Sequence, residues 1–408
     1  MDLEDQLRRV LLERPSPEAS EDIVSSVHAG MRRRVRRKRV QYVGAAASVL
    51  ALWGGAIAVL QTGPTETRPQ VPVYTVANVP AGFQIRDLTF VSTTRGYGIG
   101  SVPCATGRCT QLLQTDTGTR EWETALGPVM PVTDVSQIRF ATGADDKEYG
   151  YAFGPAYAVF QNGTWYRQPT GHPVEALEAG KAGTVVRVLA RPGGGHLVQQ
   201  STVGANAWRT VLDITAPTYN ALLRRQGDRL ALVTYDNNQG VTAEDDVSDV
   251  RMSNDGGTTW TKAAHNPCDA QSYFRSLTLG RGKDVLALCT HRSGGSFLRA
   301  SHDDGMSFGS PVDLPKRFDA TQVSAPASGG WLVAGDLAQE HARAVVSSSD
   351  EGRTWKQVAE EKAAGALPAG YLDNSNARTV WWIGADPRHV WRSSDGGETW
   401  LEARFADR

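Results

Sequence analysis

An eight-residue pattern recurs in the C-terminal half of the chain and constrains the fold more than any other feature. It reads SNDGGTTW, SHDDGMSF, SSDEGRTW and SSDGGETW, and these copies begin at Ser253, Ser301, Ser348 and Ser393. The fifth-position glycines are 48, 47 and 45 residues apart. A catalytic motif is normally used once, so the repetition indicates architecture. A period near 45 residues is typical of a four-stranded propeller blade.

Three weaker copies upstream extend the repeat to seven units. They are QTDTGTREW around Gly118, QNGTW around Gly163 and QSTVGANAW around Gly204. Between the octets, apolar runs alternate with turn signals, which is a strand pattern and not a helical one. Seven units of this length account for residues 72–408, so no further domain is needed there. The predicted fold class is an all-β, seven-bladed β-propeller.

The chemistry of the octet fits a tight turn between two strands. Asp395 can accept hydrogen bonds from N–H groups one or two residues further on, and Gly397 can adopt a positive φ. Thr399 and Trp400 are expected to begin a strand, where the indole packs against neighbours. The same structural roles are predicted for Ser253, Asp255, Gly257, Thr259 and Trp260; Ser301, Asp303, Gly305 and Phe308; Ser348, Asp350, Gly352, Thr354 and Trp355; and Ser393.

The octet S-x-D-x-G-x-T-W resembles the Asp-box, or BNR repeat, of the sialidase-like propellers. The resemblance covers about residues 72–408, and the segment from Gly82 to Gly100 resembles the start of a blade in that class. The Gly-His and Trp-Asp signature of WD40 repeats is missing, which favours the BNR type. In the family the Asp-box is structural and lies away from the ligand face, so the resemblance implies a fold and not an activity.

The first seventy residues differ in kind from the rest. Val43 to Leu60 are 18 residues without a charge, which span roughly 27 Å as a helix, close to a bilayer core. Arg32 to Arg39 carry seven positive charges just before them, and such a run stays in the cytoplasm. We therefore expect a cytoplasmic tail at 1–41, a transmembrane helix at 42–61, a linker at 62–71 and an extracytoplasmic propeller in the cell membrane. The alternative is a signal peptide cleaved after Ala56-Ile57-Ala58.

Residues 1–31 are expected to begin with a short amphipathic helix that Pro15 ends, because Leu3, Leu7, Val10 and Leu11 share one helical face. This segment is either a solvated tail or a docking site for a cytoplasmic partner, in which case the chain would be a transmembrane sensor or regulator. The layout resembles membrane-anchored actinobacterial proteins with short N-terminal tails, including some anti-sigma-type regulators.

All four cysteines lie beyond the apolar segment. An even number of cysteines in an exported domain implies two disulfides. The blade order favours Cys104–Cys109 across a hairpin and Cys268–Cys289 at one sheet edge. The alternative is a metal site formed by Cys268 and Cys289 with His265 and His291, although the spacing does not match usual zinc patterns. No cofactor or resident metal is expected.

Charge and motifs narrow the function classes. The whole chain has a net charge of −1, but 32 basic and 36 acidic residues follow residue 71, which argues against general nucleic-acid binding. The sialidase Phe-Arg-Ile-Pro motif has its nearest match in FQIRD, where Arg86 is displaced by two positions and no proline follows Ile85. We therefore predict no catalytic residues, and a non-catalytic binding module for a protein or glycan. A sialidase-like glycoside hydrolase is the alternative, because two carboxylates need not be close in sequence.

One insertion suggests a binding surface. The longest step between octet glycines, 53 residues, holds the extra segment Asn237 to Ser248 between the second and third strands of unit 4. The candidate partner-binding residues there are Glu244, Asp245, Asp246 and Asp249. We expect this loop on the face opposite the octets, where both cysteine pairs also converge. Three roles remain open for this loop: a contact for a basic partner, a weak Ca²⁺ site, or only a solvated loop.

Overall fold

The structure, a computed structural model, describes residues 71–406 except 77, 106, 129–133, 181–182, 236–246, 327–328, 338–341, 363–370 and 375–377. The predicted tail, transmembrane helix and nearly all of the linker lie outside the described residues. Within the described ranges, no helix is long and apolar enough to cross a membrane.

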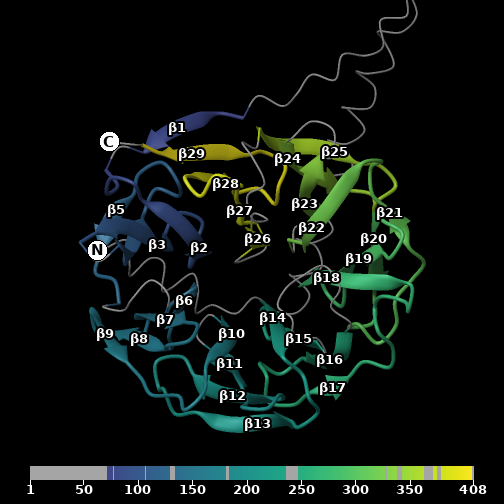
Figure 1. Ribbon diagram of the computed structural model, residues 1–408, viewed down its shortest axis with the longest axis horizontal. Helices are drawn as coiled ribbons and strands as arrows, with labels where there is room; N and C mark the ends of the chain where they lie inside the picture. The colour runs from purple at the N-terminus through teal and green to yellow at the C-terminus, as the bar shows by residue number, and fades with distance from the viewer. Residues whose placement is uncertain are drawn as a thin grey trace, which may run out of the picture. The chain divides into compact units, whose positions relative to one another are not determined.

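Seven sheets, antiparallel except for one strand pair in the last, are arranged in a ring around a central axis (Figure 1), which confirms the predicted all-β, seven-bladed propeller. In six of the blades the four strands follow one another in sequence order from the inner edge outward. Blades 1 to 4 consist of β2 (Gln84–Phe90), β3 (Gly96–Cys104), β4 (Gly107–Thr115) and β5 (Glu123–Ala125); β6 (Gln137–Thr142), β7 (Glu148–Phe153), β8 (Ala158–Gln161) and β9 (Thr164–Arg167); β10 (Val174–Ala179), β11 (Thr184–Ala190), β12 (His196–Thr202) and β13 (Arg209–Ile214); and β14 (Asn220–Gln226), β15 (Arg229–Tyr235), β16 (Val247–Ser253) and β17 (Thr261–Lys262).

Blade 7 has a fifth strand, because the N-terminal strand β1 pairs in parallel with the C-terminal strand β29. Glu402 N–H donates to the carbonyl of Pro72 (2.9 Å), which extends the pairing. The outer edge of the last blade is thereby covered, and both ends of the propeller are fixed in one sheet. Blades 5 to 7 consist of β18 (Ser272–Leu279), β19 (Val285–His291), β20 (Ser296–Ser301) and β21 (Val312–Asp313); β22 (Phe318–Ser324), β23 (Trp331–Leu337), β24 (Ala342–Ser348) and β25 (Lys356–Lys362); and β26 (Tyr371–Asn374), β27 (Val380–Ile383), β28 (His389–Ser393) and β29 (Leu401–Phe405) with β1 (Val73–Val76).

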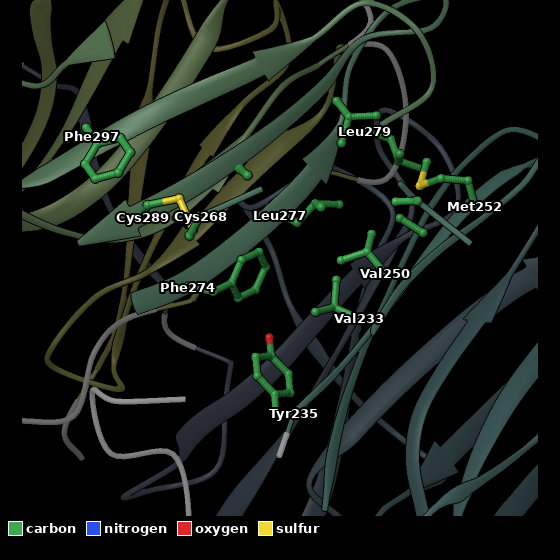
Figure 2. Close-up of a cluster of buried hydrophobic side chains, with 14 residues drawn as sticks. Val233, Tyr235, Val250, Met252, Cys268, Phe274, Leu277, Leu279, Cys289 and Phe297 are labelled. Atoms are coloured by element: carbon green, nitrogen blue, oxygen red, sulfur yellow. A yellow bond between two sulfur atoms is a disulfide. The ribbon is translucent and has the colours of Figure 1, made fainter. Parts of the chain in front are cut away.

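The core is divided among the contacts between blades. Seven hydrophobic clusters occur among the described residues, one at each interface between neighbouring blades. Figure 2 shows the cluster between blades 4 and 5, where Val233 and Val250 of one blade meet Phe274 and Leu277 of the next. Strands that are buried on both faces explain the continuous apolar runs of the sequence.

The four octets form the turns between the third and fourth strands of blades 4 to 7, and they share one hydrogen-bond pattern. In each, the serine hydroxyl accepts the N–H of the fifth-position glycine at 2.7–2.9 Å. The aspartate accepts the N–H of the seventh residue at 2.9 Å. That donor lies four residues further on, so the expected offset of one or two residues is wrong, because the turn is a wider loop. Gly397 has a φ of 96°, in the left-handed region.

The aromatic residue that ends each octet is buried to different degrees. Trp400 is 3% exposed, whereas Trp260 and Trp355 are half-buried. The indole N–H of Trp400 donates to its own octet at Gly397 O (3.0 Å), but that of Trp355 donates to Asp313 O of blade 5 (3.2 Å). Thr399 and Trp400 precede β29 and do not begin it, which corrects the expectation.

Both predicted disulfides are present. Cys104–Cys109 joins β3 to β4, with Cα atoms 5.9 Å apart, and Cys268–Cys289 joins the segment before β18 to β19, with Cα atoms 5.8 Å apart. Because Cys268 and Cys289 are bonded to each other, they are not metal ligands. No group of three or more potential metal-binding side chains occurs in the described part of the chain.

Candidate binding site in the central channel

The first strand of every blade lies at the inner edge of its sheet, so these strands surround the channel (Figure 1). In each of them a buried apolar residue, such as Leu177 or Leu223, is followed by a polar one. We call these seven polar residues the waist: Thr89, Arg139, Glu178, Arg224, Thr278, Ser324 and Asp373.

Arg139 joins one side of the waist to the other. Its guanidinium lies 2.8 Å from Asp87 Oδ2, 3.3 Å from Glu178 Oε1 and 3.8 Å from Asp373 Oδ2. It also donates to the hydroxyl of Tyr371 (3.1 Å), which in turn donates to Asp373 (2.6 Å). These residues come from blades 1, 2, 3 and 7, so the network crosses the channel.

Burial controls the protonation of this network. Burial raises the pKa of Asp87 above its ordinary value, and the Arg139 charge opposes this only in part. Burial raises the pKa of Glu178 in the same way, again against Arg139. Burial disfavours the charged form of Arg139, but the attraction of Glu178 and the other neighbouring groups outweighs it, so the pKa of Arg139 is raised. The arginine therefore stays charged at neutral pH.

A cavity lies on each side of the waist, and both cavities are lined by Arg139 and Glu178. One, of about 520 Å³, is lined by the C-terminal ends of inner strands and by the β14–β15 turn at Gln226 to Asp228. This turn accepts an octet N–H, Gly256 N–H to Asp228 O (2.9 Å), so this cavity opens on the side of the octets. We call that side the octet face.

The other cavity, of about 590 Å³, opens on the opposite side, which we call the distal face. Its lining includes the starts of inner strands, the β7–β8 turn at Gly154 and Pro155, and Tyr235 at the end of β15. Charged, amide, hydroxyl and aromatic side chains alternate with apolar ones. This distal-face cavity combines a recess with convergent polar groups, as ligand sites do.

A buried histidine orients one carboxylate group of the distal-face cavity. Glu175 Oε2 lies 2.8 Å from His196 Nε2, and His196 Nδ1 lies 2.8 Å from Thr218 Oγ1. His196 is fully buried, whereas the Glu175 side chain is 22% exposed. The imidazole thus fixes one carboxylate oxygen while the carboxylate lines the cavity.

The predicted binding loop lies mostly outside the described residues, which include neither Glu244 nor Asp245 nor Asp246. Asp249 lies in β16, where it is 8% exposed. Its carboxylate contacts Arg251 Nε (2.6 Å) and Lys262 Nζ (3.3 Å) of the same blade.

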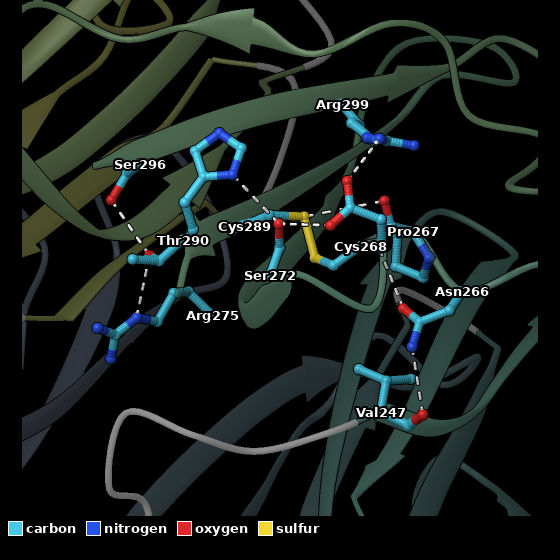
Figure 3. Close-up of a disulfide and its surroundings, with 12 residues drawn as sticks. Val247, Asn266, Pro267, Cys268, Ser272, Arg275, Cys289, Thr290, Ser296 and Arg299 are labelled. Atoms are coloured by element: carbon cyan, nitrogen blue, oxygen red, sulfur yellow. Dashed lines mark hydrogen bonds and ion pairs between the residues drawn. A yellow bond between two sulfur atoms is a disulfide. The ribbon is translucent and has the colours of Figure 1, made fainter. Parts of the chain in front are cut away.

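The two disulfides and the ends of the β15–β16 loop lie on the distal face, as the antiparallel strand order requires. They do not form one patch, because blade 1 is separated from blades 4 and 5 by two blades in either direction around the ring. Blades 4 and 5 are linked here: Asn266 donates to Val247 O (3.3 Å) and accepts Cys268 N–H (3.0 Å) (Figure 3).

The waist was missed by sequence reasoning, which examined Arg86 as the nearest arginine motif. Arg86 is exposed and does not line either channel cavity, whereas the adjacent Asp87 is 3% exposed and bound to Arg139. The available signal was a charged residue inside an apolar first strand, repeated in the unit sequences QIRFAT, VEALEA and NALLRRQ.

Comparison with known proteins supports the fold. No protein-family model matches the chain, and no curated protein matches it by sequence. Among solved structures, "YCF48 bound to D1 peptide" is 14% identical, with a TM-score of 0.50, and the match covers 83% of this chain and 100% of that one. The β-propeller domain of the Trilobed protease from Pyrococcus furiosus is 10% identical, with a TM-score of 0.53, and the match covers 81% and 97%. The chain is thus similar to known propellers in fold.

Proposed function

We propose that this chain is a membrane-anchored, extracytoplasmic propeller of the Asp-box type that binds a segment of another protein in its distal-face cavity. The observation that carries the proposal is this cavity of about 590 Å³ at the mouth of the channel, lined by side chains from six blades. A glycan is the other ligand class that such a polar, aromatic-bearing recess fits.

The common bonding of the four octet turns supports the Asp-box type. Each aspartate accepts hydrogen bonds from the hydroxyl of the octet's own serine and from both the hydroxyl and the backbone N–H of its seventh residue. The polar groups of such a turn bond to each other, which is consistent with a structural role. The ligand is then expected on the distal face.

The ion pairs of Arg139 with the carboxylates around it favour a binding role without catalysis. Asp87, Glu178 and Asp373 are all near the one guanidinium of Arg139, and Asp373 also accepts the Tyr371 hydroxyl. Carboxylates committed to internal ion pairs and hydrogen bonds are poor candidates for the free acid and nucleophile that glycoside hydrolysis requires.

A protein ligand is favoured over a glycan by one comparison. The structurally similar propeller described as YCF48 is bound to a D1 peptide. We extend peptide binding to this chain as part of the proposal, because its cavity offers both charged and apolar walls to an extended segment.

Anchoring is proposed from the sequence alone. The uncharged segment from Val43 to Leu60 follows seven positive charges, so the propeller would be exported and the N-terminus would stay inside. The two disulfides agree with an oxidising compartment.

Site-specific photocrosslinking tests the binding site. A benzophenone side chain at Thr321, in the distal-face cavity, should give light-dependent adducts with a partner protein in intact cells. The matched position is Gln226 in the octet-face cavity, which should give none. Adducts formed from Gln226 but not from Thr321 would place the ligand on the wrong face for this proposal.

A further inference from the structure

Four of the seven inner strands contain a β-bulge near their distal ends. The strand register shifts at Arg86 in β2, Glu175 in β10, Arg275 in β18 and Thr321 in β22. A bulge redirects the side chain of the extra residue away from the regular alternation, and bulges are frequent beside functional sites. Three of these four residues, all except Arg86, line the distal-face cavity.

Arg275 brings a positive charge to this cavity. Its Nε–H donates to the hydroxyl of Thr290 (3.2 Å). In the described ranges, no carboxylate lies within ion-pair distance of Arg275. Arg224, on the adjacent inner strand β14, lines the same cavity and likewise has no ion-pair partner among those residues. Two neighbouring blades thus present guanidinium groups to the recess.

Glu175 brings the opposite charge from blade 3, on the other side of blade 4 from Arg275. Its Oε2 is held by His196, and no other hydrogen bond to its carboxylate occurs within the described part of the chain. The second oxygen is therefore available to a donor inside the cavity. Because a partly desolvated charge gains most from a complementary charge, the ligand should carry one group of each sign.

We propose that Glu175 and Arg275 determine specificity, and that the distal-face cavity selects a peptide segment with a basic side chain for Glu175 and an acidic side chain for Arg275. This inference rests on the proposed function and adds the charge pattern of the ligand. His196 acts as a positioning residue, because it orients the Glu175 carboxylate. The peptide lies across the inner strand of blade 4, since Glu175 and Arg275 belong to the blades on either side of it.

The test uses the full chain, purified in detergent, and an immobilised library of random hexapeptides. Wild-type protein should enrich peptides that contain both an acidic and a basic residue. Arg275→Gln should abolish the preference for the acidic residue and keep that for the basic one, and Glu175→Gln should do the reverse. Each variant should bind the best wild-type peptide about tenfold more weakly. Arg275→Lys should restore much of the acidic preference.

The matched control is Arg86→Gln, which removes the bulged arginine of blade 1 that does not line the cavity. It should leave both preferences unchanged. If both cavity variants keep the wild-type preferences while the Thr321 benzophenone still crosslinks to a bound peptide, the charge assignment is wrong and the binding site stands. If wild-type protein enriches no peptide, peptide binding is wrong, and this inference falls with it.

Discussion

At the scale of single residues, the tryptophan that ends the octet should contribute different amounts to the free energy of unfolding in different blades. Trp400 is 3% exposed and packs in the cluster between blades 6 and 7, whereas Trp355 is half-buried. Trp400→Ala should lower the free energy of unfolding by about 3–5 kcal/mol through lost packing and the cavity that remains. Trp355→Ala should cost clearly less. Urea unfolding of both variants checks this, and equal losses would contradict the burial difference.

The octet aspartates should make stability depend on acid pH. Hydrogen bonds from Thr354, first its hydroxyl and then its backbone N–H, lower the pKa of Asp350 to about 2. A carboxyl group with a lowered folded-state pKa stabilises the fold above its unfolded pKa, near 3.9, and loses this contribution as pH falls toward 2. Asp350→Asn should therefore reduce the Tm at neutral pH, with a difference that shrinks below about pH 4. A difference in Tm that is constant from neutral pH to about pH 2.5 would contradict this.

The repeated octet identified the residues that form the turn, but not the hydrogen bonds between them. Aspartate, glycine and threonine are turn residues wherever they occur, so a turn could be predicted. The four-residue reach of Asp395 to Thr399 could not, because it depends on backbone angles across the whole loop. Arg139 was missed for a different reason: the sequence does not say that a charge in an apolar strand will meet Asp87 from another blade.

At the scale of elements, the disulfides brace the distal ends of two blades. In the chain-entropy view, the Cys268–Cys289 bond, with a separation of 21 residues, should contribute about 3 kcal/mol, and the Cys104–Cys109 bond, with a separation of 5, about 2 kcal/mol. Replacing each pair by alanine and measuring the unfolding free energy checks the order. Peptide mapping without reduction should recover both pairs, and free thiols in the native protein would contradict them.

Strand number and order could be predicted, but the bulges could not. The period of the octets predicted four strands per unit, and the apolar runs separated by turn signals indicated strands and not helices. A bulge is a shift in the register between two paired strands. The bulges at Glu175 and Arg275 therefore depend on how β10 and β18 pair with their neighbours. The three bulged residues of the distal-face cavity, Glu175, Arg275 and Thr321, could for this reason not be predicted from the sequence of any one strand.

At the scale of the whole molecule, the period of the octets predicted seven units because each blade repeats one local design. The closure of the ring by pairing of the two ends of the propeller was not predicted, because Val73 to Val76 carry no octet. They join the ring by pairing with the edge of β29. Closure of this kind depends on where the last blade ends in space, which a repeat pattern does not contain.

The proposed topology is also a whole-molecule property. Protease added to intact cells should remove the propeller, residues 72–408, and leave the tail, residues 1–41, protected, because the anchor would place them on opposite sides of the membrane. An antibody against each part distinguishes the fragments, with lysed cells as the control. A propeller that resists protease in intact cells, or a mature chain that begins near Val59, would contradict the anchor.

Hydrogen–deuterium exchange of the full chain, with and without the peptide that it enriches most strongly, will show which face of the propeller binds the ligand. If the ligand occupies the distal-face cavity, amide exchange should slow at the distal ends of the inner strands, at Val174 to Leu177, Asn220 to Leu223 and Phe274 to Ser276. Exchange at the octet turns should not change. Protection confined to the octet turns or to Gln226 to Asp228 would mean that the ligand binds on the octet face and not in the distal-face cavity.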